Sequence, residues 1–216
     1  MNRRRFLASS GGAALLAALP AAMSSTNASA QTSSARARIV IAGAGAAGLA
    51  MASRLSRGMP NATVTVVDAT REHHFQPGFT LVGAGIWSPG QVTERNADYM
   101  PRGVEWIEDA VAEFDPDANV VFTASGARVA YDFLIVATGL KLDYAAIDGM
   151  DASLIGSEGI ASIYAGPNEA AASARAIDRF LETGGVGLFG RPAGEMKCAG
   201  APLKITFITD DKARRQ

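Results

Sequence analysis

Cysteine, histidine and net basic charge are all scarce in this sequence, and each scarcity excludes a class of protein. Cys198 is the only cysteine, so no disulfide can form within the chain. His73 and His74 are the only histidines. Because neighbours in sequence rarely bind one metal ion together, we expect no metal site. The 20 Lys and Arg residues are balanced by 21 Asp and Glu residues, so we expect no nucleic-acid partner.

Long hydrophobic runs are also missing, and the apolar run of residues 13–23 is too short to span a bilayer comfortably. It follows a basic start, and the small residues Ala28-Ser29-Ala30 come after it. Residues 1–30 therefore predict an export signal peptide. The Arg-Arg-x-Phe-Leu pattern of residues 3–7 is similar to a twin-arginine signal, with an ordinary secretory signal as the alternative. We expect an exported, periplasmic protein in which residues 31–37 form a flexible linker.

The residues after this linker predict a strand, a glycine-rich turn, a helix and a second strand. Residues 38–42 are a β-branched run typical of a buried parallel strand, and residues 63–67 form another. Between them, residues 49–58 contain helix formers, preceded at once by the GxGxxG pattern of residues 43–48. This order is typical of a unit that binds a dinucleotide, and a chance glycine turn is the alternative.

Each position of the turn has a physical role in the predicted site. The first glycine permits the tight turn, the second lets the backbone approach a pyrophosphate, and the third lets the helix pack closely on the strand. The first N–H groups of the helix face the phosphates. Asp68, at the end of the second strand, can accept hydrogen bonds from ribose hydroxyls, and its charge disfavours NADP. The candidate cofactor-binding residues here are Gly43, Gly45, Ala46, Ala47, Gly48 and Asp68.

A second motif, Ala137-Thr138-Gly139, follows the apolar run of residues 131–136. It resembles the second fingerprint of flavoproteins that have two dinucleotide-binding domains, and this favours FAD over NAD. A plain exit from strand to loop is the alternative interpretation. Ala137, Thr138 and Gly139 are therefore candidate FAD-binding residues. The sequence before this motif predicts a further parallel strand and then a three-stranded meander, at residues 104–107, 110–114, 119–123 and 127–130.

Two more stretches carry a resemblance to the sulfide:quinone oxidoreductases. They are the Gly- and Pro-containing segment of residues 73–85 and the Lys-Cys-Ala-Gly-Ala-Pro sequence of residues 197–202. The resemblance implies an enzyme that binds FAD, oxidises sulfide and passes the electrons to a quinone, with Cys198 as a catalytic residue. It also implies peripheral membrane contact in the full-length form. The flavoprotein subunit of flavocytochrome c sulfide dehydrogenase is a relative, and it implies a cytochrome as the alternative acceptor.

The residues around Cys198 also bear on the electron donor. We expect a strand at residues 185–189, after which a reductase that uses NAD(P)H would place another glycine fingerprint. The cysteine segment follows instead, so we expect a reductant other than NAD(P)H. Pro202 suits the first turn of a helix, which predicts that Cys198 lies at or just before a helix N-terminus. A small buried cysteine without a reactive role is the alternative interpretation.

The sequence as a whole predicts an α/β fold in two parts. Residues 38–150 are expected to form a Rossmann-like, parallel-sheet FAD-binding domain with a three-stranded β-meander. Residues 151–216 are expected to begin a second α/β domain, incomplete because roughly 60 residues cannot bury a full core. The resemblance implies a second cysteine and a C-terminal return segment, and the 216 residues contain neither. An FAD-dependent oxidoreductase and an inactive, truncated flavin-binding fragment are both open interpretations, whereas a plain NAD-linked dehydrogenase is disfavoured.

Overall fold

The computed structural model describes residues 32–191, 194, 196 and 198–215. The expected signal peptide, residues 1–30, lies outside the described residues. Residues 32–37 form no helix or strand, but Ser33 N donates to Gly58 O (2.7 Å) and Thr63 N donates to Ala37 O (2.9 Å). The main elements that follow are β1 (Arg38–Ala42), α2 (Ala46–Gly58), β2 (Thr63–Val67), β3 (Glu72–His74), α3 (Phe79–Gly83), β4 (Thr93–Arg95), α4 (Asn96–Tyr99), β5 (Glu105–Ile107), β6 (Val111–Asp115), β7 (Val120–Thr123), β8 (Arg128–Ala130), β9 (Phe133–Val136), α5 (Pro167–Thr183) and α6 (Ala201–Arg215).

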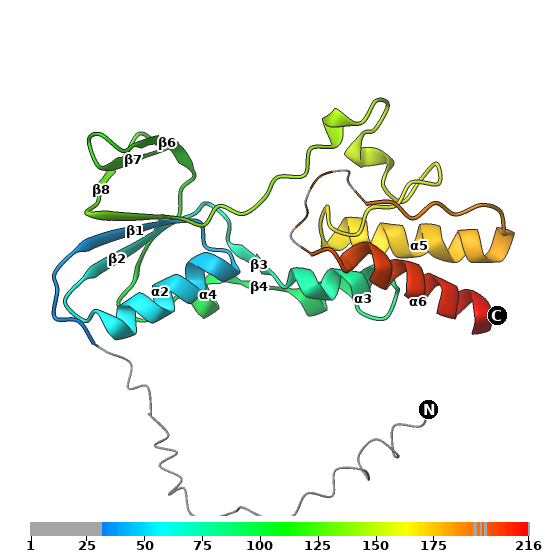
Figure 1. The fold of residues 1–216 in the computed structure, drawn as a ribbon, viewed down its shortest axis with the longest axis horizontal. Helices are drawn as coiled ribbons and strands as arrows, with labels where there is room; N and C mark the ends of the chain where they lie inside the picture. Colours follow the sequence, from blue (N-terminus) through cyan, green and yellow to red (C-terminus); the bar gives the residue numbers. More distant parts are fainter. Residues whose placement is uncertain (1–31, 192–193, 195, 197, 216) are drawn as a thin grey trace, which may run out of the picture. The chain divides into compact units, whose positions relative to one another are not determined.

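A parallel sheet in the order β5-β2-β1-β9 lies at the centre of the first part (Figure 1). Strand β1 pairs with β2 on one side and with β9 on the other, with Ile41 opposite both Val66 and Ile135. The β-branched residues of β1 are buried because both faces of this strand are covered. All four strands run in one direction, so their carboxyl ends meet at one edge of the sheet. The predicted parallel-sheet α/β fold is confirmed.

The two faces of this sheet are covered by different elements. On one face, α2 packs its Ala52 against Ile41 and Val66. On the other, Val121 and Tyr131 from the meander segment pack against Val40. The meander itself is a three-stranded antiparallel sheet in the order β6-β7-β8, as predicted. The sheet is therefore a middle layer between a helix and a second small sheet (Figure 1).

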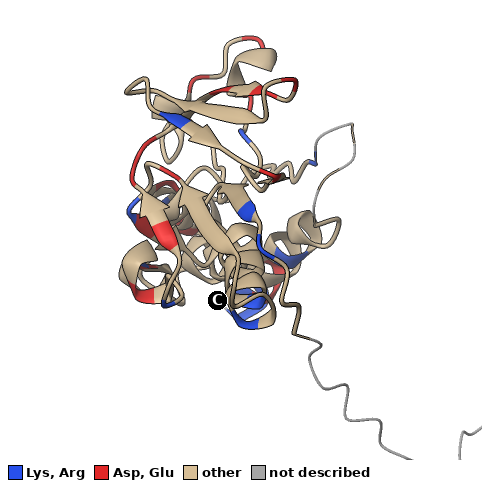
Figure 2. Cartoon of the chain, turned by 90° about the vertical axis from the view of Figure 1, so that its left-hand side faces the viewer, with Lys and Arg blue, Asp and Glu red and all other residues tan. Residues whose placement is uncertain are grey.

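Figure 2 shows basic and acidic residues interspersed along the chain, and the structure has ion pairs that include Arg38–Asp132 and Arg71–Glu108. Arg38, at the start of β1, places Nη2 2.7 Å from Asp132 Oδ1, and its backbone N donates to Asp132 Oδ2 at 2.7 Å. The Arg38 side chain, together with this backbone bond, lowers the pKa of Asp132 to about 2. The pair joins the amino ends of β1 and β9, the opposite end of the strands from the glycine turn.

A second core forms where α3 meets the C-terminal helices. Phe79 and Val82 of α3 pack with Ile163 and Ala170, so the segment that includes α3 shares a core with residues after 150. Thr80 Oγ1 and Tyr164 Oη are 2.9 Å apart and add a hydrogen bond to this contact. None of the helices in the described part of the chain is long and apolar enough to cross a membrane.

The strand expected at residues 185–189 is wrong. These residues follow α5 without regular structure. A strand needs a neighbour to satisfy its backbone groups, and the described residues place no partner strand beside this segment. Val186 and Leu188 are accordingly 89% and 93% exposed. Two of these five residues are glycine, and Gly185 has a φ of +118°, which does not suit a strand.

Candidate functional site

The glycine turn lies at the carboxyl ends of β1, β2 and β9. Gly43 follows β1 directly, and its backbone N donates to Val67 O at 2.9 Å. Its φ of +108° is a conformation that a side chain rarely adopts. A Cβ at Gly43 would collide with Ala137 O and lie 2.8 Å from Ala137 C. The two motifs that the sequence predicted as cofactor-binding, 94 residues apart, therefore touch here.

The other two glycines of the turn set the position of α2 and leave space in front of it. A Cβ at Gly48 would overlap Gly43 O, so only glycine lets the helix pack this close to the turn. A Cβ at Gly45, by contrast, would meet no atom within 4 Å. Gly45 is the N-cap of α2, and it is exposed together with Ala46 and Ala47.

The first turn of α2 is therefore suited to an anion. Helix geometry leaves the N–H groups of Ala46 and Ala47 without an acceptor inside the helix. The helix is 13 residues long, and its first turn contains no acidic residue that would compete for these donors. The partial positive charge of the helix N-terminus adds to the attraction. The open space over Gly45 and the free donors beside it together fit a pyrophosphate group.

Asp68 is half-buried directly after β2, at the same edge of the sheet. Its Oδ2 accepts a hydrogen bond from Ala44 N (2.6 Å), and its Oδ1 accepts one from Thr70 N (2.6 Å). A carboxylate can accept about four hydrogen bonds, so capacity remains for a ribose hydroxyl pair. The sequence predicted the position of this carboxylate but not its bond to the turn. That bond fixes the carboxylate beside the proposed phosphate position.

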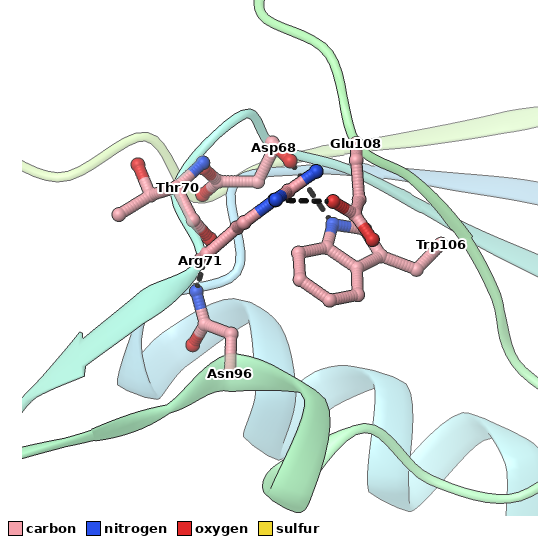
Figure 3. A network of polar contacts seen from close by, with 6 residues as sticks. All are labelled: Asp68, Thr70, Arg71, Asn96, Trp106 and Glu108. Carbon is pink, nitrogen blue, oxygen red and sulfur yellow. Dashed lines mark hydrogen bonds and ion pairs between the residues drawn. The ribbon is translucent and has the colours of Figure 1, made fainter.

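Contacts that the sequence did not reveal hold the backbone of residues 68–71 (Figure 3). Trp106 Nε1, from β5, donates to Asp68 O at 3.0 Å. Asn96 Nδ2, from the start of α4, donates to Thr70 O at 2.7 Å. On the outer side, Arg71 Nε pairs with Glu108 Oε2 at 2.7 Å. No local pattern announces these contacts, because the partners lie 26 to 38 residues apart.

The second motif follows β9. Ala137 N donates to Ala42 O at 2.8 Å, which continues the pairing of β9 with β1. Thr138 and Gly139 are exposed, and Gly139 has a φ of +74°. The motif thus turns away from the sheet beside Gly43, on the same edge as Asp68. Its part in cofactor binding stays a prediction.

Cys198 belongs to a different neighbourhood. Helix α6 begins three residues later, at Ala201, and Ala201 N donates to Cys198 O at 3.0 Å. The cysteine is half-buried and unpaired, and it lies just before a helix as predicted. Among the described residues, no hydrogen bond joins it to the glycine turn or to Asp68. The structure brings the two glycine motifs and Asp68 together, and it leaves Cys198 with the C-terminal helices.

The adjacent histidines lie on strand β3, which pairs with β4 in a two-stranded ribbon. His73 Nδ1 is 3.2 Å from Asn96 Oδ1, and His74 Nε2 is 3.3 Å from Glu72 Oε2. The described residues contain no group of three or more His, Cys, Asp or Glu side chains placed to hold a metal ion. The segment of residues 73–85 runs from strand β3 of this ribbon into α3.

Comparison with known proteins gives a family match over more than half of the chain. The family described as "Pyridine nucleotide-disulphide oxidoreductase" matches residues 37–171, which include both glycine motifs and Asp68.

Individual relatives were also found. The chain is 36% identical over 179 residues to the mitochondrial sulfide:quinone oxidoreductase of Dictyostelium discoideum, covering 82% of this chain and 39% of the relative. It is 36% identical over 181 residues to the Mus musculus protein of the same name, covering 82% of this chain and 38% of that protein. The chain therefore spans about two fifths of the length of these relatives.

Among solved structures, the sulfide:quinone oxidoreductase of Aquifex aeolicus superposes with a TM-score of 0.54 at 25% identity. The match covers 68% of this chain and 33% of that one.

Proposed function

This chain belongs to the pyridine nucleotide-disulphide oxidoreductase family, and from that premise we propose that it is the FAD-binding part of an enzyme that oxidises sulfide and passes the electrons to a quinone. It is a flavin oxidoreductase by family, with FAD as the cofactor. The similarity to two sulfide:quinone oxidoreductases over 82% of the chain supports sulfide as the substrate and quinone as the acceptor.

The meeting of the two glycine motifs at the edge of the parallel sheet is the observation that carries the cofactor site. Gly45 offers open space, and Ala46 and Ala47 offer free backbone donors, which suit the pyrophosphate of FAD. Asp68 suits the adenosine ribose, since its carboxylate lies beside the turn with acceptor capacity left. Gly43 and Gly48 keep the turn close to the strand and the helix, and this holds the backbone N–H groups of Ala46 and Ala47 in place.

The overall reaction removes two electrons and a proton from hydrosulfide and leaves sulfane sulfur, while a quinone takes the two electrons, that proton and a second proton from water. When bound, FAD supplies the two-electron relay between sulfur and quinone. We propose Cys198 as the residue that holds the substrate sulfur as a persulfide. Joining the two sulfide-level sulfur atoms releases two electrons and the protons they carry, and the electrons would pass to FAD while the protons go to water. The half-buried position of Cys198 before α6 leaves its sulfur partly accessible.

Fewer observations support the proposed cellular location and the proposed electron acceptor. The basic, apolar and small-residue pattern of residues 1–30 supports export to the periplasm. Peripheral contact with a membrane would give the full-length protein access to a lipid-soluble quinone. A cytochrome as the acceptor is the alternative for an exported member, and it would remove the need for that contact.

The test begins with the visible absorption spectrum of the purified chain after gel filtration. Flavin bands at about one FAD per chain would support the site, and anaerobic sulfide should then bleach them. In Cys198→Ala the flavin should bind as in the wild type and resist bleaching by sulfide. Dithionite should bleach both proteins, and this controls for flavin that is damaged rather than unreactive.

Three results would count against the proposal. A chain that folds and binds no flavin would remove the cofactor site. Equal bleaching of Cys198→Ala and wild type would remove the cysteine's role. Bound flavin that sulfide never bleaches would favour a non-catalytic flavin-binding fragment over an enzyme.

A further inference from the structure

Asn96 is a buried residue whose hydrogen bonds reach the backbone just after Asp68 and the side chain of His73. Only 2% of its surface is exposed, although asparagine is mostly a surface residue. Its Nδ2 donates to Thr70 O at 2.7 Å, and its Oδ1 is 3.2 Å from His73 Nδ1. Its backbone N also donates to Arg71 O at 2.8 Å. Asn96 thus contacts Thr70, Arg71 and His73 in the segment after β2.

These bonds lead directly to the carboxylate that faces the glycine turn. The Thr70 carbonyl accepts a hydrogen bond from Asn96, and the Thr70 backbone N donates to Asp68 Oδ1 at 2.6 Å. Asp68 Oδ2 is then free to receive Ala44 N at 2.6 Å. From the opposite side, Trp106 Nε1 fixes Asp68 O at 3.0 Å. Figure 3 shows the two side chains approaching the 68–71 backbone from separate elements, α4 and β5.

The chemistry of the position requires an amide. The asparagine amide donates to Thr70 O through Nδ2, and its Oδ1 accepts from His73 Nδ1 when that nitrogen carries the proton. Leucine has a similar shape but would leave both partners unpaired. Aspartate would aim an oxygen at the Thr70 carbonyl and add a second negative charge near Asp68.

We propose that Asn96, together with Trp106, is a positioning residue that holds the Asp68 carboxylate where it can read the ribose hydroxyls of the cofactor. The inference rests on the proposed FAD site. Asn96 does not contact the ligand. It restricts the backbone of residues 68–71, so that Asp68 does not have to be ordered when the ligand binds.

The experiment measures how well the chain distinguishes ADP from 2′,3′-dideoxy-ADP, which lacks both ribose hydroxyls. Dissociation constants for the two ligands are obtained by titration calorimetry on the 216-residue chain. A hydrogen bond to a charged group contributes about 1.5 kcal/mol or more, so the wild type should prefer ADP by about tenfold or more. In Asn96→Ala the preference should fall below about threefold.

Two further variants keep the result interpretable. Trp106→Phe retains an aromatic ring but loses the N–H that holds Asp68 O together with one ring of the indole, so its preference for ADP should also fall. Asn61→Ala removes another asparagine-to-backbone bond, an exposed one from Nδ2 to Ser34 O (3.1 Å) away from Asp68, and its preference should match the wild type. In an Asp68→Asn background, adding Asn96→Ala should change the preference no further.

A merely structural role gives a different pattern. If both Asn96→Ala and Trp106→Phe bind the two ligands more weakly by the same factor, the ratio is unchanged and the proposal is overturned. The proposed cofactor site itself survives that outcome, because wild type still prefers ADP. A wild type that binds neither ligand would overturn the cofactor site and this inference together.

Discussion

Replacing Gly45 by alanine should separate cofactor binding from folding. The backbone at Gly45 has φ −70° and ψ −177°, which alanine adopts without strain, and the added Cβ would meet no atom within 4 Å. Alanine is a poorer N-cap than glycine, but it also reduces the freedom of the unfolded chain. The two effects oppose each other and leave the free energy of unfolding within about 0.5 kcal/mol of wild type.

The same methyl group would stand where the pyrophosphate is proposed to approach the backbone. Displacing the phosphates from two charge-assisted hydrogen bonds would remove about 3 kcal/mol of binding free energy, or about 100-fold in the dissociation constant of FAD. Flavin fluorescence quenching would give the affinity, and urea unfolding of the flavin-free protein would give the stability. Gly58→Ala, at the other end of α2 and also in open space, is the matched control and should leave both quantities near wild type.

Two results would refute this reasoning. Binding of FAD to Gly45→Ala within about threefold of wild type would mean that phosphates do not approach this glycine. A fall of more than about 2 kcal/mol in the stability of the flavin-free variant would mean that the space above Gly45 is filled.

Three other changes test the fold. Gly48→Ala should lower the free energy of unfolding by about 1–3 kcal/mol despite the better helix propensity of alanine, because its Cβ would overlap Gly43 O; a urea midpoint equal to wild type would contradict this. Asp132→Asn should flatten the acid side of the stability curve: the Arg38 pair lowers the folded pKa of Asp132 to about 2, so its contribution is present above about pH 4 and is lost as the pH falls toward 2. Urea midpoints at pH 5 and pH 2.5 should differ less in this variant than in wild type. Phe79→Ala, at a side chain only 2% exposed, should cost about 3–5 kcal/mol by calorimetry or urea, and a cost below 1 kcal/mol would contradict the packing described.

Those parts of the fold with a local signal were predictable from the sequence. The β-branched run of residues 38–42, bounded by glycine, specifies a buried strand by itself, and the structure has β1 there. The same holds for the meander, whose strands are marked off by turn residues. Asp68 was placed correctly because its distance from Gly48 is set by one helix and one strand.

The remainder depended on contacts between distant residues. Nothing adjacent to Asn96 or Trp106 indicates that their side chains reach the same short loop, since only the folded sheet and ribbon bring them there. The failed strand at residues 185–189 has two causes: two of its five residues are glycine, and no partner strand is placed beside it among the described residues. Pairing is a property of the whole sheet, so composition alone cannot predict it.

The shared core of Phe79, Val82, Ile163 and Ala170 bears on how this chain can be divided. A chain ended at residue 150, the expected domain boundary, would lack Ile163 and Ala170, and Phe79 of α3 would lose these packing partners. Such a shortened chain should be prone to self-association, because apolar side chains of α3 would be exposed. For the same reason, backbone amides of α3 and α5 should exchange with deuterium at similar rates, as members of one cooperative unit. Helix α3 thus packs as one unit with residues after 150 rather than with the nucleotide-binding residues alone.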